Sequence, residues 1–204
     1  MKYILFIAFI LSVVSCAKHD GYTLTGLVPE AWEGKPVFLV LDDTNQPHFI
    51  DSTKISGGKF KFQGKFEVPR YCTINIYLDP NDRQTRSKII NFSLFIDSTA
   101  VEATCNYSGK HPVFQISGSG TQTEYQNYLS EIQPMEDDRS KTFHAYGEAY
   151  YSTKDLAKAI DLAKLVTEKR LAIREAKMKY LKAHPESAIS VKIAQELSDR
   201  NSDL

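Results

Sequence analysis

The sequence predicts a mainly β protein with an α-helical appendage, in the form of an antiparallel β-sandwich or open barrel followed by a helical segment. Short alternating runs of β-branched and aromatic residues fill residues 22–119, and turn residues separate the runs. No helical pattern interrupts them, which favours antiparallel sheets. After residue 119 the apolar residues recur at helical spacing. The chain therefore divides into a signal peptide (1–15), a tether (16–21), a β domain (22–119) and a helical segment (120–204).

The first 16 residues have the parts of a secretory signal. Lys2 supplies a positive charge, residues 3–11 form an unbroken apolar run, and small residues precede Cys16. The apolar run is too short to cross about 30 Å of hydrocarbon. The arrangement resembles a bacterial lipoprotein signal, which implies removal of residues 1–15 and acylation of Cys16, so that lipid would hold the chain at a membrane. An ordinary signal peptide with a chance cysteine is the alternative.

Eight candidate strands follow one another between residues 22 and 118. In chain order they are YTLTGLV, KPVFLVLD, HFIDSTKI, KFKFQGKF, RYCTINIYL, KIINFSLFI, AVEATCNY and VFQISG. The fifth alternates cleanly, because every second residue from Cys72 to Leu78 is apolar and shares one face. Gly57-Gly58 separates the third strand from the fourth, and adjacent glycines supply the positive φ angles of a tight hairpin.

Two cysteines besides Cys16 lie in these strand-like runs. Cys72 and Cys105 are far apart in the sequence, so they do not form the CxxC pair of a redox centre. Two buried thiols are the favoured interpretation. A structural disulfide between them is the alternative, since neighbouring strands can bring Cα atoms to about 5.5 Å and an extracytoplasmic compartment permits the bond.

The helical segment is predicted to contain three helices. Thr121 and Glu124 fit a capping box, which predicts a helix from there to about Pro134 and then a charged connection, MEDDRSKTF. A long second helix is predicted over residues 155–183 and a short third one over residues 187–197. The third helix has little left to pack against, which suggests that a partner or a further segment covers it.

The long helix has an apolar face and a charged face. Its predicted inner face consists of Leu156, Ile160, Ala163, Val166, Ile173 and Tyr180. Its predicted outer face consists of Lys158, Lys164, Glu168, Lys169, Arg174, Glu175, Lys177, Lys179 and Lys182. A solvated helix face explains these charges better than a membrane or nucleic-acid patch. Because 25 basic residues balance 25 acidic ones over the whole chain, we expect no nucleic-acid partner.

Several short motifs follow one another in a defined order. A GxV strand, with Gly26 and Val28, precedes a strand at Lys35–Leu39, an IDST segment at Ile50–Thr53 and a GKFxFxGK hairpin arm at Gly58–Lys65. FSLFID, the segment Phe114–Tyr128 and the closing KYLKAHPESAIS at Lys179–Ser190 come after them. Together they resemble the uncharacterised β-rich (DUF4369-type) domain at the N-terminus of many Gram-negative lipoproteins of the thiol-disulfide oxidoreductase type.

The resemblance implies an accessory role rather than an enzyme. In longer members of that family a thioredoxin-like domain, whose chemistry depends on a CxxC pair, follows the last helix. This chain contains no CxxC, so the resemblance brings no catalytic residue. The chain is then either a truncated oxidoreductase or a stand-alone module that positions or recognises a partner, such as a thioredoxin-like domain or another envelope protein. We expect it in the cell envelope, with the periplasmic side of the outer membrane favoured.

The sequence carries no other catalytic or metal signature. GxSxG, GxxxxGK[ST] and HExxH motifs are absent and the five histidines lack ligand spacing, so we expect no cofactor and no metal. The candidate ligand or partner contacts are aromatic, namely Trp32, Tyr125, Tyr128, Tyr146 and Tyr150. The tyrosines of the helical junction are expected to dock the helices onto the sandwich or onto a partner domain. If Trp32 instead formed an exposed platform, a glycan- or peptide-binding surface lipoprotein would be the alternative function; a purely structural envelope protein is a third.

Overall fold

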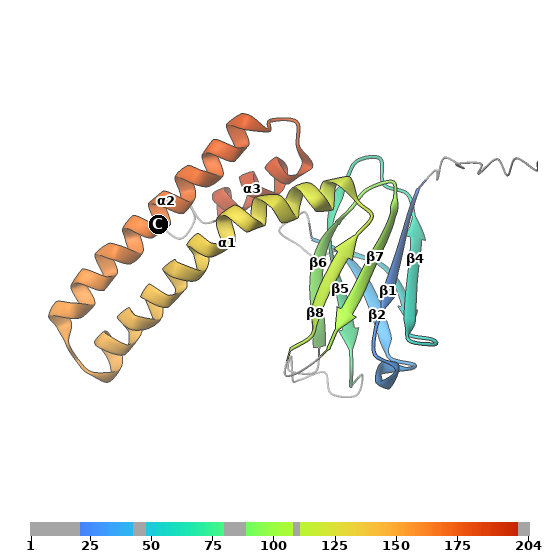
Figure 1. Cartoon of the computed structure of the whole chain (residues 1–204), viewed down its shortest axis with the longest axis horizontal. Helices are drawn as coiled ribbons and strands as arrows, with labels where there is room; N and C mark the ends of the chain where they lie inside the picture. The colour runs from blue at the N-terminus through green and yellow to red at the C-terminus, as the bar shows by residue number, and fades with distance from the viewer. Residues whose placement is uncertain (1–20, 43–47, 80–88, 108–110, 200–204) are drawn as a thin grey trace, which may run out of the picture.

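The computed structural model describes residues 21–42, 48–79, 89–107 and 111–199 of the chain. The predicted signal peptide (1–15), the lipidation candidate Cys16, residues 16–20 of the tether and residues 200–204 lie outside the described residues. Within the described residues, eight strands come first along the chain and three α-helices follow them (Figure 1). This order confirms the predicted mainly β fold with a helical appendage.

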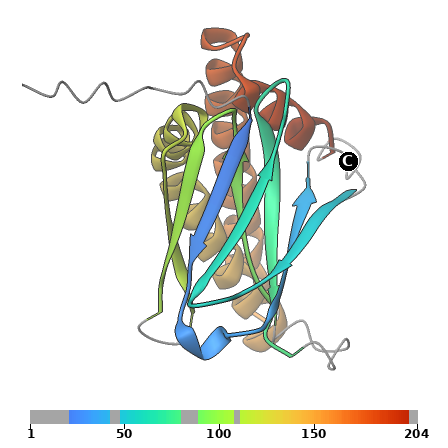
Figure 2. The ribbon, with the colours of Figure 1, turned by 90° about the vertical axis from the view of Figure 1, so that its right-hand side faces the viewer.

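The strands form two four-stranded sheets that pack face to face (Figure 2). The elements of the β region are β1 (Tyr22–Leu27), the 3-10 turn η1 (Glu30–Trp32), β2 (Pro36–Leu41), β3 (His48–Lys54), β4 (Lys59–Gly64), β5 (Arg70–Tyr77), β6 (Ile89–Ile96), β7 (Ala100–Asn106) and β8 (Val113–Ser117). One sheet has the strand order β4-β1-β7-β8 and the other β3-β2-β5-β6. Neighbouring strands are antiparallel apart from the parallel pair of β1 and β7. The predicted sandwich is therefore confirmed.

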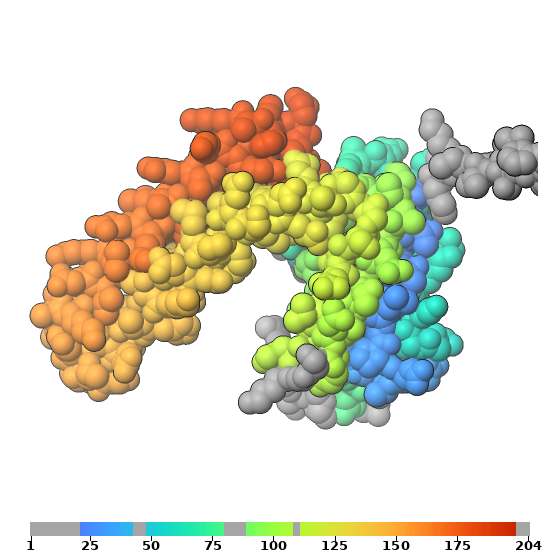
Figure 3. All heavy atoms as spheres, in the orientation of Figure 1, coloured from blue at the N-terminus to red at the C-terminus, as the bar shows by residue number. Residues whose placement is uncertain are grey.

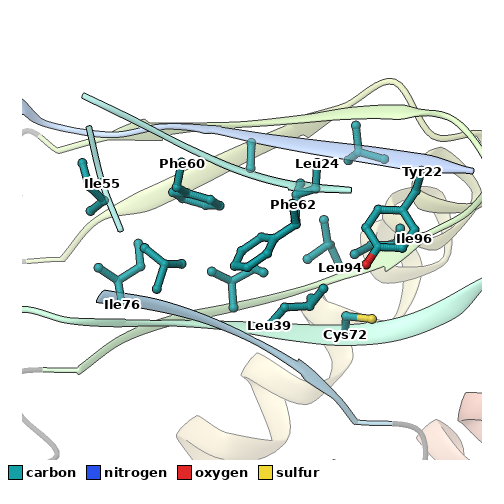
Figure 4. Packing of buried hydrophobic residues seen from close by; sticks show 14 of the residues in the cluster. Tyr22, Leu24, Leu39, Ile55, Phe60, Phe62, Cys72, Ile76, Leu94 and Ile96 are labelled. Carbon is teal, nitrogen blue, oxygen red and sulfur yellow. The ribbon is translucent and has the colours of Figure 1, made fainter. Parts of the chain in front are cut away.

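Alternate residues of both sheets fill the space between them (Figure 4). On β5, Cys72, Ile74 and Ile76 are fully buried, whereas the residues between them are only partly covered. This is the arrangement that a strand with one buried face requires. Phe62 enters the same space from β4 of the opposite sheet. Burial of these apolar side chains is the main force that holds the two sheets together.

Glycine is required at two places in the sandwich, for different reasons. Gly57 and Gly58 have φ angles of 59° and 69°, the positive values predicted for the turn between β3 and β4, and such angles disfavour residues with a side chain. The predicted hairpin is limited to this turn, where Ser56 and Lys59 form an isolated antiparallel bridge, because β3 and β4 then enter different sheets. Gly26 on β1 is needed for a different reason. A Cβ atom at this position would lie 2.0 Å from the ring of Phe60, so the phenylalanine takes the space that a side chain would fill.

Two long helices leave the sandwich as an arm (Figures 1 and 3). They are α1 (Gly120–Gly147) and α2 (Leu156–Ala183), and a turn of π-helix, η3 (Glu148–Ser152), follows α1 directly. The shorter α3 (Ala188–Asp199) follows α2. No helix in the described ranges combines the length and the apolar character needed to span a bilayer.

The start of α1 differs from its prediction. The N-cap is Ser119, whose hydroxyl accepts a hydrogen bond from the Gln122 amide at 3.0 Å. The helix therefore begins before Thr121, and the predicted capping box of Thr121 and Glu124 does not form its end. The carboxylate of Glu124 instead accepts a hydrogen bond from the Tyr180 hydroxyl at 2.8 Å, which ties α1 to α2.

The predicted end of α1 near Pro134 is also wrong, because the charged segment MEDDRSKTF is helical. Its charges pair along and across the helices instead of facing only water. Arg139 binds Glu136 at 2.9 Å within α1, and Asp138 forms an ion pair with Lys169 of α2. These pairs make a polar segment compatible with a helix that continues beyond the proline.

The second helix has the predicted length, but its faces differ from the prediction. Leu156, Ile160 and Ala163 are exposed rather than on an inner face. Lys177, which was expected on the solvent face, is buried. The reason is that α2 packs mainly on α1, so a narrow seam around Ala159 is covered while the side that carries Leu156, Ile160 and Ala163 is not.

The third helix has a packing surface within the chain, contrary to the expectation. Ile189 and Ile193 of α3 are fully buried in one cluster with Phe95 of β6 and Tyr125 of α1. The amphipathic face of α3 therefore closes the base of the arm against the sandwich.

Candidate functional site

The sandwich and the arm meet at a second apolar core, separate from the core between the sheets. Phe95 of β6 contacts the rings of Tyr71 and Tyr125 at centroid distances of 5.2 and 5.1 Å. Tyr128 of α1 extends this cluster to Tyr180 of α2 at 4.8 Å. Tyr125 and Tyr128 are both buried, so they dock the helices onto the sandwich, the first of the two roles expected for the junction aromatics.

Hydrogen bonds fix the first turn of α1 against the end of β6. The Phe95 amide donates to the side-chain oxygen of Gln122 at 2.8 Å, so the helix satisfies a backbone donor of the strand. Asp97 accepts hydrogen bonds from the Ser119 hydroxyl at 2.7 Å and from the Thr121 amide at 3.3 Å. Burial alone would raise the pKa of Asp97, but the hydrogen bonds that its carboxylate accepts outweigh burial and lower the pKa below its usual value.

We expect acid to weaken this junction. The pKa of Asp97 is lower in the folded chain than in the unfolded chain, where it is about 3.9. Its carboxylate therefore stabilises the fold above that value, and the contribution is lost as the pH falls through the folded pKa. Asp97→Asn should lower the melting temperature near neutral pH and make the melting temperature fall less on acidification. Asp51→Asn, at an exposed carboxylate of β3, is the control; equal acid profiles for wild type and Asp97→Asn would contradict this role.

At the base of the arm, one buried lysine joins all three helices. Lys177 Nζ on α2 lies 3.0 Å from Glu196 Oε2 of α3 and 3.8 Å from Glu136 Oε1 of α1. A buried ammonium group requires such compensation, because removing it from water alone is costly. Two carboxylates from two other helices provide it, so α1, α2 and α3 are tied at one point.

A cavity of about 560 Å³ lies between the end of the sandwich and the start of α3. Tyr71 and Phe95 contribute apolar surface to it, and Lys192 Nζ lies 4.6 Å from the centroid of the Tyr71 ring. The charged residues of its lining have both signs and are Arg70, Lys192, Glu124 and Glu186. A volume of this order suits a small ligand, and the position between two structural units is one where ligand sites are common.

The remaining predicted contact residues lie far from this cavity in the fold. Trp32 is only 6% exposed, because η1 places it in the sandwich core with its ring 5.9 Å from that of Tyr107. The expectation that Trp32 contacts a ligand is therefore wrong. Tyr146 and Tyr150 lie at the other end of the arm, 5.8 Å apart, and Phe143 adds a third ring at 6.0 Å from Tyr146. Phe143 and Tyr150 are exposed there.

Both cysteines of the sandwich are thiols rather than a disulfide, but only one of them is buried as the favoured interpretation expects. Cys72 lies in the core on β5. Cys105 on β7 is partly buried, and burial raises its pKa, which keeps it in the less reactive protonated form. In the part of the chain that the structure describes, no group of three or more His, Cys, Asp or Glu side chains is placed to hold a metal ion.

The strand and helix patterns alone do not single out the residues that hold the junction. Phe95 does leave a signal, because Leu94, Phe95 and Ile96 form an unbroken apolar run, which is typical of a strand covered on both faces. Lys177 leaves none. It is one of eleven charged residues on α2, and no sequence pattern distinguishes it from the others.

Comparison with known proteins identifies a family for this chain. The family model described as "Domain of unknown function (DUF4369)" matches residues 22–125, just over half of the 204 residues. The matched segment covers all eight strands and the first turns of α1, as far as the tyrosine that docks α1 on β6. No curated protein matches the chain.

Proposed function

Because the chain belongs to the DUF4369 family of domains of unknown function, we propose its role from its geometry: a lipid-anchored module of the cell envelope that catalyses no reaction and positions or recognises a partner protein. The partner is a thioredoxin-like protein or domain, or another envelope protein. The location is the periplasmic side of the outer membrane.

The observation that carries this proposal is the arm. Its two helices contain 28 residues each, which corresponds to about 42 Å of helix. The arm is fixed at one end by the Phe95 cluster and by the ion pairs of Lys177, and its other end presents the exposed rings of Phe143 and Tyr150. A rigid arm with exposed aromatic side chains at its far end suits a protein that holds a partner at a set distance from the sandwich.

Lipid anchoring rests on Cys16 and the segment before it, and palmitate labelling tests it. Radiolabelled palmitate should enter the full chain expressed in a Gram-negative host, and the protein should sediment with membranes. Cys16→Ala should lose the label and leave the membrane fraction, whereas Cys105→Ala, a matched change at a cysteine of the sandwich, should keep both. Equal labelling of wild type and Cys16→Ala, or no labelling of the wild type, would refute the anchor.

The absence of catalysis is tested by insulin reduction with a dithiol reductant, using a thioredoxin as the positive control. The proposal is supported by the burial of Cys72 and by the raised pKa of Cys105, since neither thiol has the properties of a redox nucleophile. We expect the rate with this chain to equal the rate with reductant alone. Turnover above that rate, lost on Cys105→Ala, would refute the non-enzymatic role.

A ligand-binding surface lipoprotein is the second candidate, and the cavity beside Tyr71 and Lys192 favours it. The aromatic residues of the sandwich do not support a flat glycan-binding platform in the same way. Trp32 is buried, and the exposed ring of Phe49 stands at 60° to Phe38, which in turn stands at 76° to Tyr77. Rings at these angles offer no common plane for a sugar. A glycan array and a peptide library screened with the full chain separate the two candidates: specific binding weakened by Tyr71→Ala supports the second.

A further inference from the structure

We propose that the exposed side of α2 is a self-association surface, on which a second copy of this chain packs its own α2 in the antiparallel direction, about a two-fold axis near residue 169. This inference goes beyond the proposed function and does not depend on the lipid at Cys16.

An apolar stripe runs along the exposed side of α2. It consists of Leu156, Ile160, Ala163, Thr167, Leu171 and Met178, interrupted by Arg174. At 100° per residue these positions fall within about 80° of one another around the helix. Its four large apolar members are each at least 38% exposed. The stripe is distinct from the seam that packs on α1, so α2 has two apolar faces and α1 covers only one.

Four residues of the stripe are arranged symmetrically about residue 169, which points to a second copy as the occupant. Ile160 and Met178 lie nine residues on either side of that position, and Thr167 and Leu171 lie two residues on either side. In an antiparallel pair, Ile160 therefore faces Met178 of the second copy, and Thr167 faces Leu171 of the second copy. The two other apolar positions, Leu156 and Ala163, face the aliphatic parts of Lys182 and Glu175 of the second copy. This is the isologous, self-complementary arrangement of a two-fold interface.

Charges along one flank of the stripe complement one another under the same symmetry. Glu175 of the second copy lies opposite residue 163, which is next to Lys164. Lys179 of the second copy lies opposite residue 159, which is two residues from Asp161. The two-fold axis repeats each pair, which gives four pairs of opposite charge across the interface. Arg174 is the exception, because it lies on the stripe at the position opposite Lys164 of the second copy. Within one copy Lys164 contacts only Asp161 among the ion pairs described for it, at 3.5 Å and with both side chains largely exposed. Such an exposed pair contributes little by itself, so Lys164 can turn to a second copy at small cost.

The shape and position of the surface agree with this pairing. A shallow hollow on α2 is lined by Ile160, Ala163, Lys164, Thr167 and Glu168. Under the proposed symmetry, Leu171 of the second copy faces it as a knob faces a hole between helices. α2 runs along the side of the arm that faces away from the sandwich (Figures 1 and 3), so a second arm can approach it.

Charge reversal tests the proposal in the full chain, solubilised in mild detergent and measured by sedimentation equilibrium. The wild type should show a monomer–dimer equilibrium. Lys164→Glu and Glu175→Lys, each alone, should raise the dimer dissociation constant about tenfold or more, because each replaces two attractive pairs with two repulsive ones. An equimolar mixture of the two variants should form a heterodimer as stable as the wild-type dimer, since its flanks are again complementary.

Two further variants make the test specific. Lys158→Glu changes the same charge on the opposite side of α2 and should leave the dissociation constant unchanged. Glu168 lies on the flank beside the two-fold axis, where it faces Glu168 of the second copy. Because the two carboxylates repel each other, Glu168→Gln should strengthen the dimer. Circular dichroism confirms that each variant is folded. A monomeric wild type, a response to Lys158→Glu equal to that of Lys164→Glu, or a mixture that stays monomeric would overturn the proposal.

Discussion

Phe62→Ala is expected to lower the free energy of unfolding by about 3–5 kcal/mol. The side chain is 1% exposed, and its ring points from β4 toward Leu39 and the opposite sheet (Figure 4). Truncation removes the burial of the ring and leaves a cavity between two hydrogen-bonded sheets. Such sheets cannot move together enough to fill the space, so the cost of the cavity adds to the loss of burial.

The measurement is urea unfolding of the full chain, followed by circular dichroism. Phe49→Ala is the matched control, because Phe49 is 55% exposed on β3 and its truncation leaves no closed cavity. We expect a loss below about 1 kcal/mol for the control. If Phe62→Ala cost no more than Phe49→Ala, the location of Phe62 between the sheets would be wrong.

The strands could be predicted from the sequence because each buries one face in a single environment. Cys72, Ile74 and Ile76 alternate with polar residues, and the space between the two sheets accepts only one of these sets. The turn at Gly57-Gly58 has a local cause as well, since positive φ angles favour glycine wherever they occur. Where a structural feature depends on residues that are close together in the sequence, the sequence pattern is sufficient to predict it.

The arm could be predicted only in part, because its faces are set by contacts between segments far apart in the sequence. Lys177 is buried because Glu136 and Glu196 come to it from two other helices. Ile160 is exposed because nothing in the described chain covers that side of α2. The sequence pattern places Ile160 inside and Lys177 outside, which is the reverse of what the contacts between helices produce. The junction between arm and sandwich also depends on contacts between distant segments, since two strands and the first turn of α1 separate Phe95 from Tyr125 in the sequence.

Phe95→Ala is expected to uncouple the arm from the sandwich. Phe95 is fully buried on the outer face of its sheet, where it contacts Tyr71 and Tyr125 and belongs to the cluster that includes Ile189 and Ile193 of α3. Its truncation removes the central ring of the junction at a cost of about 3–5 kcal/mol. The core between the sheets does not contain this side chain, so the loss falls on the contact between arm and sandwich and makes the arm open first.

The chain provides a separate reporter for each part. Trp32 is the only tryptophan and lies in the sandwich core, so its fluorescence follows the sandwich, whereas the helical circular dichroism signal follows the arm. In the wild type both signals should change at the same urea concentration, as expected for a single cooperative unit. In Phe95→Ala the helical signal should be lost at a lower concentration than the fluorescence change, while Phe143→Ala, at an exposed ring of the arm, should leave the two transitions together. Coincident transitions in Phe95→Ala would show that the cluster around Phe95 does not hold the arm in place, and with it the rigid connection on which the positioning role depends would be lost.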